Sequence, residues 1–324
     1  MTEPTPRAGR HAATDGLTAE TVNELATDGL SAETVDELAA AGLDPAAVVA
    51  IVANALAEDL GGPDGVDVTS AATIPAEQTD TAELVARADG VLAGLAVARA
   101  VFDLASGRTV RFSAKAADCA HVHRGDVLAV VSGPTRALLT AERTALNLLC
   151  RMSGVATHTR AWADELAGTG ATVLDTRKTT PGLRILEKYA VRAGGGTNKR
   201  MGLYDVAMVK DNHKLAAGGV AEAYDRVRAA YPDVPVQVEV TTVAEAEQAV
   251  AAGATFLLLD NMPPALLRDV VAAVGGRAEL EATGGLTLAA AREYGETGVN
   301  YLSVGGLTHS SPILDIALDL RPRA

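Results

Sequence analysis

Short apolar runs that end in a polar residue alternate with helical stretches along the second half of the chain. These runs span residues 172–175, 206–210, 236–239, 256–260, 278–281 and 301–303. Such alternation is typical of parallel α/β structure, in which a helix follows each strand. Four of the runs end at Glu239, Asp260, Glu281 and Ser303, at spacings of 21, 21 and 22 residues. One strand plus one helix fits each interval, so the pattern predicts an α/β barrel rather than an open sheet.

The first half has a different pattern. Residues 83–94 predict a hairpin around Asp89 and Gly90. A helix over residues 140–150 would close an α+β domain. We therefore predict an acidic extension over residues 1–44, an N-terminal domain over 45–151, and a barrel domain with a C-terminal segment over 152–324.

The extension contains an internal repeat, because residues 15–25 recur at 28–38 with a period of 13. Thr18 and Ser31 predict the N-caps of two short acidic helices. The extension is interpreted as a solvated arm without chemistry. A protein-interaction role for the repeat is the alternative.

Charge excludes some classes of function. The chain has 41 acidic and 28 basic residues, a net charge of −13, and few aromatic residues, which argues against a nucleic-acid binder. The most apolar run, residues 45–57, is too short to cross a bilayer, and no export signal is recognised. Cys119 and Cys150 form no zinc or disulfide pattern, so a cytoplasmic protein without membrane attachment is expected.

Basic residues gather in one segment of this acidic chain. Residues 172–214 hold nine basic and four acidic residues, which points to a small anionic ligand. Two glycine pairs, in Thr283-Gly284-Gly285 and Val304-Gly305-Gly306, follow successive predicted strands. Backbone N–H groups at such loops can approach a phosphate closely.

Charged residues end several of the predicted strands. Asp175, Lys210, Glu239, Asp260 and Glu281 are predicted to point into one mouth of the barrel. The histidines, including His158, have no partners at metal-ligand spacing and are assigned ordinary surface or loop positions.

Several ordered motifs resemble the quinolinate phosphoribosyltransferases, also called carboxylating nicotinate-nucleotide diphosphorylases. They are residues 142–147 (ERTALN), 175–184 (DTRKTTPGLR), 187–192 (EKYAVR), 194–196 (GGG), 210–213 (KDNH), 259–261 (LDN), 281–285 (EATGG) and 303–306 (SVGG). The resemblance runs from about residue 56 to 318.

The resemblance implies a type II phosphoribosyltransferase with an N-terminal α/β sandwich domain and an incomplete TIM-like α/β barrel. It also implies a homodimer with shared active sites, in some cases built into a hexamer. The implied reaction joins quinolinate to phosphoribosyl pyrophosphate with Mg²⁺ and yields nicotinate mononucleotide, pyrophosphate and CO₂, a step of NAD biosynthesis.

The resemblance and the chemistry together assign the site residues. Quinolinate is a dicarboxylate, which suits the guanidinium forks of Arg143, Arg177 and Arg200, and by resemblance Arg143 comes from the neighbouring subunit. Lys178 and Lys210 are expected at carboxylate or pyrophosphate oxygens. Glu239 and Asp260 are assigned to the oxocarbenium-like centre, where they would also hold ribose hydroxyls and Mg²⁺–phosphoribosyl pyrophosphate. Residues 283–285 and 304–306 are assigned to the 5′-phosphate. Thr176 and Lys199 are assigned to substrate binding.

Position 199 departs from the family, which usually has Asn-His-Arg where this chain has Asn198-Lys199-Arg200. Because lysine stays charged near pH 7, quinolinate binding is predicted to lack a histidine-like inflection. Two alternative functions remain: a type II transferase for nicotinate or another anionic base, and a non-catalytic anion-binding regulator. The cation set argues against the first, and Glu239 with Asp260 argues against the second.

Overall fold

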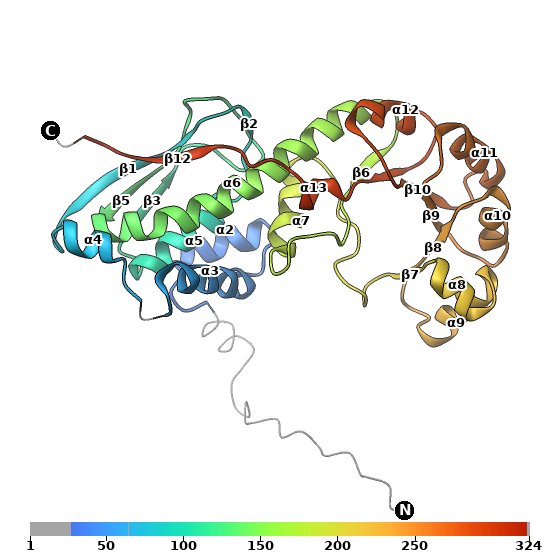
Figure 1. Ribbon diagram of the computed structural model, residues 1–324, viewed down its shortest axis with the longest axis horizontal. Coiled ribbons are helices and arrows are strands. Elements are labelled where there is room, and N and C mark those ends of the chain that lie inside the picture. The colour runs from blue at the N-terminus through green and yellow to red at the C-terminus, as the bar shows by residue number, and fades with distance from the viewer. Residues whose placement is uncertain (1–26, 64, 323–324) are drawn as a thin grey trace, which may run out of the picture.

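The computed structural model describes residues 27–63 and 65–322, and these form two lobes connected by one long helix (Figure 1). This helix, α6 (Thr135–Leu166), buries residues such as Leu138, Ala141, Ala145 and Leu149 at spacings of three and four. That spacing places them along one helical face, which packs into the core. The predicted helix over residues 140–150 is part of α6.

The N-terminal lobe is built on an antiparallel sheet in the order β12-β1-β5-β3. Its strands are β1 (Thr79–Ala86), β3 (Arg111–Ala114), β5 (Val127–Pro134) and β12 (Ile316–Leu320); the lobe also contains α2 (Ala32–Ala40), α3 (Pro45–Leu60), α4 (Val68–Thr73) and α5 (Leu95–Ser106). Strand β12 comes from the end of the chain and pairs with β1 from Ala82↔Leu320 to Ala86↔Ile316. The C-terminal segment thus completes the sheet of the first lobe.

The hairpin predicted around Asp89 and Gly90 is wrong. Strand β1 pairs with β5 and β12, whereas the short β2 (Gly90–Val91) pairs with β4 (His121–Val122). The chain does turn near Asp89 and Gly90, but β2 then joins a second, two-stranded sheet because β1 already has a partner on each side.

The second lobe holds a parallel sheet in the order β6-β11-β10-β9-β8-β7. Its strands are β6 (Thr172–Leu174), β7 (Ala207–Val209), β8 (Val236–Val240), β9 (Phe256–Asp260), β10 (Glu279–Thr283) and β11 (Tyr301–Ser303). Each predicted strand is present, within two residues of its predicted ends. Strands β6 and β7 are the two edges, so the barrel is incomplete, and the predicted α/β fold is confirmed.

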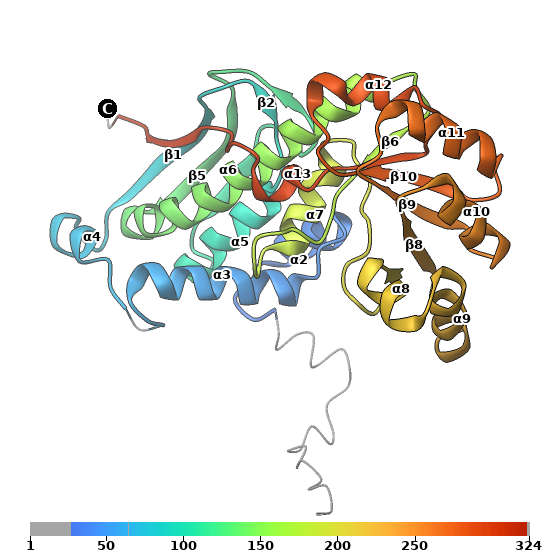
Figure 2. The same cartoon turned by 45° about the vertical axis from the view of Figure 1, so that its right-hand side comes forward.

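Helices follow these strands, and most of them cover the outside of the sheet (Figure 2). These are α8 (Asp211–Ala217), α9 (Val220–Ala230), α10 (Val243–Ala251), α11 (Pro264–Val274), η1 (Leu288–Ala290) and α12 (Ala291–Gly295). In contrast, α7 (Arg184–Ala193) and α13 (Gly306–His309) lie against α6 between the two lobes. All five residues of β8 are buried, as expected for a parallel strand covered on both faces.

The second copy of the 13-residue repeat is docked on the protein, which corrects the solvated-arm interpretation for this part of the extension. Ser31 is the N-cap of α2, as predicted, and Leu30 and Leu38 are buried against the first lobe. Thr18 and the first copy lie outside the described residues. No single helix of the described chain is long and apolar enough to span a membrane; only α2 and α3 taken together pass that test, and they meet at 113°.

Candidate active site

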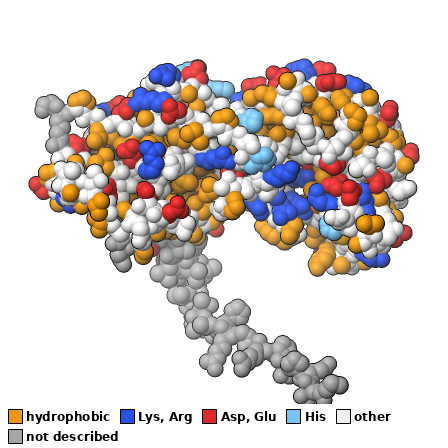
Figure 3. All heavy atoms as spheres, viewed as in Figure 1, with side chains coloured by type: hydrophobic (Ala, Val, Ile, Leu, Met, Phe, Trp, Pro, Cys, Tyr) orange, Lys and Arg blue, Asp and Glu red, His pale blue; other side chains and the backbone are white. Residues whose placement is uncertain are grey.

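A cavity of about 880 Å³ opens at the carboxyl ends of the barrel strands and reaches α6. The predicted site residues that line it are Thr176, Arg177, Lys178, Lys199, Arg200, Lys210, Glu239, Asp260, Thr283, Gly284, Gly285, Val304, Gly305 and Gly306. A cluster of Lys and Arg side chains is visible on the same face, between the two lobes (Figure 3). The structure therefore brings together residues from loops more than 120 positions apart in the sequence.

One wall of the cavity is cationic. Arg177 and Lys178 belong to the loop of residues 176–180 after β6, here called the cationic loop, and Arg200 follows α7. In the described part of the chain, none of these three side chains forms an ion pair with a carboxylate. The buried Nε of Arg177 also has no hydrogen-bond partner. Burial, followed by the charge of Arg177, lowers the pKa of Arg200, so a bound anion would stabilise this wall.

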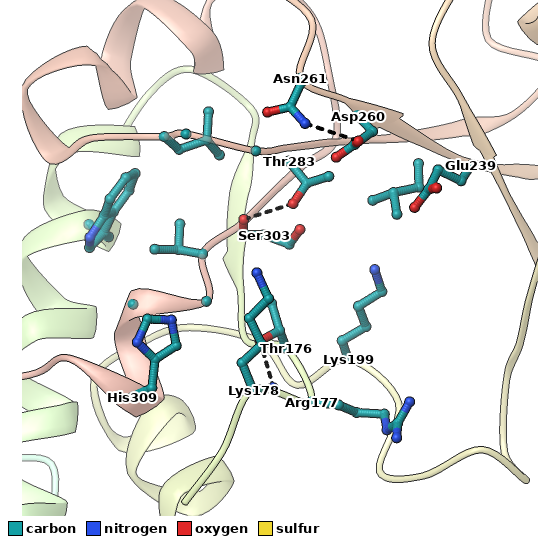
Figure 4. A pocket seen from close by; sticks show the side chains of 18 of the residues that line it. Thr176, Arg177, Lys178, Lys199, Glu239, Asp260, Asn261, Thr283, Ser303 and His309 are labelled. Carbon is teal, nitrogen blue, oxygen red and sulfur yellow. Dashed lines mark hydrogen bonds between the residues drawn. The ribbon is translucent and has the colours of Figure 1, made fainter. Parts of the chain in front are cut away.

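The opposite wall carries the carboxylates Glu239 and Asp260 and the first glycine loop, which begins at Thr283 (Figure 4). Glu239 and Asp260 end neighbouring strands β8 and β9. Glu239 accepts from Lys210 at 2.9 Å, whereas Asp260 is half-buried and accepts a hydrogen bond from Asn261 at 3.0 Å. Each carboxylate is thus oriented by a neighbouring donor, and Asp260 keeps oxygen lone pairs open to the cavity.

The two glycine loops, residues 283–285 and 304–306, follow β10 and β11. Gly284 has φ +94°, and a Cβ there would lie 2.2 Å from Oδ1 of Asn261. A Cβ at Gly305 would lie 2.9 Å from Cδ of Lys178. Glycine is required at position 284 because of this backbone conformation and close contact, whereas a Cβ at position 305 would displace the flexible Lys178 side chain. The absence of side chains lets an anion approach the backbone N–H groups of both loops.

Two strand-end carboxylates predicted to face the mouth are instead buried in ion pairs. Asp175 is fully buried and lies 2.5 Å from Nζ of Lys188, whereas Glu281 is fully buried and lies 2.5 Å from Nζ of Lys199. Burial raises the pKa of Asp175, and Lys188 opposes the shift. Glu281 thus pairs with a cation that lines the cavity, whereas Asp175 pairs with Lys188, which is buried outside it.

Lys199 lines the cavity while paired with Glu281. The second oxygen of Glu281 accepts from Nε2 of Gln237 at 2.7 Å, so both carboxylate oxygens have a donor. Burial lowers the pKa of Lys199, and the Glu281 carboxylate opposes the shift. The lysine at this position therefore has its own buried counter-ion.

A buried network fixes the cationic loop to the second glycine loop. Glu187 accepts from Thr180 N at 2.9 Å and from Arg151 Nη2 at 2.8 Å, and Arg151 also donates to Thr308 O. Thr308, directly after this glycine loop in α13, donates through Oγ1 to Lys178 O at 2.8 Å. The two loops are thus held together by bonds at Lys178 O and, through Glu187 and Arg151, at Thr180.

The lining residues that the sequence analysis did not assign to the site include His158, Trp162 and His309. Trp162 Nε1 donates to His158 Nε2 at 3.2 Å, so His158 Nδ1 carries the proton and donates to Ser311 Oγ at 2.8 Å. Burial lowers the pKa of His158, which favours this neutral form. The surface or loop assignment of His158 is therefore wrong; its position reflects the way α6 reaches the barrel mouth, which local sequence does not reveal.

Arg143 is the one predicted site residue outside the cavity. It is exposed on α6 in the first lobe. Within one chain the structure does not bring it to the other cations.

Comparisons with known proteins bear on the whole chain. The model of the quinolinate phosphoribosyl transferase N-terminal domain matches residues 67–153, and that of the C-terminal domain matches residues 155–319. A nicotinate-nucleotide pyrophosphorylase (carboxylating) of Mycobacterium leprae is 48% identical over 83% of this chain and 95% of its own length. A probable enzyme of the same name from Bacillus subtilis is 44% identical over 81% and 90%.

A solved structure shares the fold. The nicotinate-nucleotide pyrophosphorylase of Francisella tularensis is 33% identical, covers 85% of this chain and 96% of its own, and superposes with a TM-score of 0.81. The similarity includes both lobes and the strands that surround the cavity. The chain therefore belongs to the quinolinate phosphoribosyl transferase family.

Proposed function

We propose that this enzyme transfers phosphoribosyl from phosphoribosyl pyrophosphate to the ring nitrogen of quinolinate and releases CO₂. The products are nicotinate mononucleotide and pyrophosphate, a step of NAD biosynthesis. The observation that carries the proposal is a single cavity that brings together cations without carboxylate partners, two carboxylates on the opposite wall, and two glycine loops. A substrate pair with two carboxylates, a diphosphate and a 5′-phosphate matches that division of charge.

The cationic wall would hold the anionic groups of both substrates. The guanidinium groups of Arg177 and Arg200 suit the adjacent carboxylates of quinolinate, with Lys199 beside them. Lys178 and Lys210 are proposed as catalytic residues at the pyrophosphate, where negative charge grows as the C1′–O bond breaks. The glycine loops, with Thr283 and Val304, would bind the 5′-phosphate through backbone N–H groups.

The carboxylates of Glu239 and Asp260 would stabilise positive charge at C1′ and hold the ribose hydroxyls. The ring nitrogen then forms the new bond to C1′ as pyrophosphate leaves. When the C2 carboxylate departs as CO₂, the positively charged ring takes up the electron pair of the broken bond, and a proton replaces the carboxylate. No described residue is required as a base for that step.

Mg²⁺ is part of this proposal. The described residues contain no cluster of three or more His, Cys, Asp or Glu that would form a metal cage. Two cavity carboxylates, Asp260 with an open oxygen and Glu239, fit an ion held mainly by substrate phosphates, since Mg²⁺ accepts one or two carboxylates and keeps its remaining ligands as phosphate and water. The ion would neutralise charge on the diphosphate.

We further propose a homodimer that works in the cytoplasm and shares its active sites. The exposed position of Arg143, outside the cavity of its own chain, supports its contribution to the cavity of a second copy. Mixing inactive Arg143→Ala and Lys178→Ala chains would restore up to about a quarter of the parent activity, because random pairing makes half the dimers mixed and one of their two sites is intact. Mixtures without any recovery would refute the shared site.

The reaction is tested by turnover with phosphoribosyl pyrophosphate and Mg²⁺, with quinolinate and nicotinate offered separately. Stoichiometric CO₂ and nicotinate mononucleotide from quinolinate are expected. Turnover of nicotinate alone would refute the proposed base, and turnover of neither would favour an anion-binding regulator.

A further inference from the structure

The second repeat is held on α5 by a buried acid. Asp103, 4% exposed, accepts from Ser31 N at 3.0 Å and from Thr34 Oγ1 at 2.5 Å. Ser31 also caps α2 by accepting from Thr34 N at 3.3 Å. The start of α2 is thus fixed by a cap and by a carboxylate from α5.

A buried arginine holds the same helix one turn further along. Arg99, also 4% exposed, pairs with Glu33 at 2.6 Å and with Glu37 at 3.1 Å, and its guanidinium lies 5.2 Å from the centre of the Phe112 ring. Removing α2 would take both carboxylates away from Arg99. The surface around Arg99 and Asp103, here called the α5 docking site, therefore suits an acidic, capped helix as its ligand.

Close apolar contacts complete the recognition. Gly29 has φ +101°, and a Cβ there would lie 2.7 Å from Leu104, so glycine is required. Leu30 and Leu38 are buried, with exposed fractions of 5% and 0%. The residues of the second repeat that contact the site, here called the contact code, are Gly29, Leu30, Ser31, Glu33, Thr34, Glu37 and Leu38.

The first repeat contains that entire code 13 residues earlier. Its residues Gly16, Leu17, Thr18, Glu20, Thr21, Glu24 and Leu25 correspond to Gly29, Leu30, Ser31, Glu33, Thr34, Glu37 and Leu38. The two copies differ at the cap, where Thr replaces Ser, and at Asn23, which corresponds to the exposed Asp36. Six of the seven contact residues are identical in the two copies, and at the seventh, the cap, both threonine and serine supply a hydroxyl.

We propose that the first repeat, residues 15–25, is a second ligand of the α5 docking site and binds it within the same chain when the second repeat leaves. The chain allows this exchange. In the described register four residues separate Leu38 from the buried Leu43, and 17 would separate Leu25 from it. Because closure cost grows only with the logarithm of loop length, the second repeat is preferred by roughly ninefold. A tethered segment also acts at an effective concentration of about millimolar, which a second chain does not reach.

Hydrogen exchange of the full-length chain, followed by mass spectrometry, tests the proposal without reference to catalysis. The variant Leu38→Asp removes the buried leucine of the second repeat. We expect amides of residues 31–38 to exchange at least tenfold faster than in the parent, and amides of residues 18–25 to slow by a similar factor. In Leu25→Asp/Leu38→Asp both segments exchange fast, and Leu25→Asp alone leaves residues 31–38 unchanged.

A milder pair of variants gives the same test if Leu38→Asp disturbs folding. Thr34→Val removes only the hydroxyl that donates to Asp103, which Thr21 can replace, and Thr21→Val/Thr34→Val removes both. Unchanged fast exchange of residues 18–25 in both Leu38→Asp and Thr34→Val would overturn the proposal. Slow exchange that appears only at high protein concentration would also overturn it, because the ligand would then belong to a second chain.

Discussion

Thr308→Val tests whether the contact between the cationic loop and the second glycine loop controls substrate binding. Valine has nearly the same volume, so the change removes only the hydroxyl, which donates to Lys178 O at 2.8 Å and, at a longer 3.4 Å, to Gly305 O. Thr308 is fully buried, so no water replaces the donor. A neutral hydrogen bond of this kind contributes about 1 kcal/mol, which corresponds to roughly a fivefold change in an equilibrium or rate constant.

Steady-state kinetics should therefore show kcat/KM for phosphoribosyl pyrophosphate reduced about fivefold, because the bond positions Lys178, which is proposed to act at the pyrophosphate. Thr159→Val is the matched control: Thr159 is equally buried, and its hydroxyl donates to Val155 O at 2.8 Å within α6. Both variants should lose about 1 kcal/mol of unfolding free energy in urea. Equal kinetic losses in the two variants, or unchanged kinetics in Thr308→Val, would refute the reasoning, and Thr308→Ser should restore the parent values.

Three further predictions concern the cavity and the loop beside it. Gly284→Ala should lower kcat/KM for phosphoribosyl pyrophosphate at least tenfold, because the new Cβ displaces Asn261. The control Gly285→Ala should have a clearly smaller effect, because position 285 has φ +62° but no atom within 4 Å of a new Cβ. Equal effects of the two variants would contradict this reasoning. Quinolinate affinity, measured by calorimetry from about pH 6 to 8, should show no inflection near 6.5, and an inflection that disappears in Lys199→Gln would argue against a charged lysine there. Burial alone would raise the pKa of Asp205, but backbone N–H donors lower it, so its stabilisation is present above about pH 4 and is lost on further acidification; urea unfolding of Asp205→Asn should have a flatter acid limb than the parent.

The sequence predicted the parallel sheet well because strand ends and their polar residues are local signals. Glu239 and Asp260 follow apolar runs at a constant spacing, and both line the cavity. Asp175 and Glu281 end strands in the same way, yet both are buried in ion pairs. Their partners come from α7 and from the segment after it, so the difference depends on tertiary packing rather than on the pattern around each acid.

Long-range features were the least predictable. Strand β12 joins a sheet whose other strands lie about 180 residues or more earlier, and no local pattern indicates that partner. The docking of α2 was missed for a similar reason. An acidic segment is expected to be solvated, and the sequence does not show that Arg99, a buried cation on α5, faces it. His158 is one polar residue in a long helix, and only the path of α6 brings it to the cavity.

The structure also changes the meaning of the basic segment. Lysines 188, 199 and 210 each pair with a carboxylate, so their charges are balanced before any ligand binds. In the described chain, the cations that remain for an anion in the cavity are chiefly Arg177, Lys178 and Arg200.

That charge balance bears on two proposals: the Mg²⁺ ion and the contribution of a second subunit to the site. Quinolinate, a diphosphate and a 5′-phosphate together carry more negative charge than three cations neutralise. The remainder is expected to fall on Mg²⁺ and on Arg143 of a second copy, which is why the proposed ion and the proposed dimer are linked. Lys199 adds little net charge beside Glu281, so its effect should be to direct a hydrogen bond at the substrate rather than to attract it.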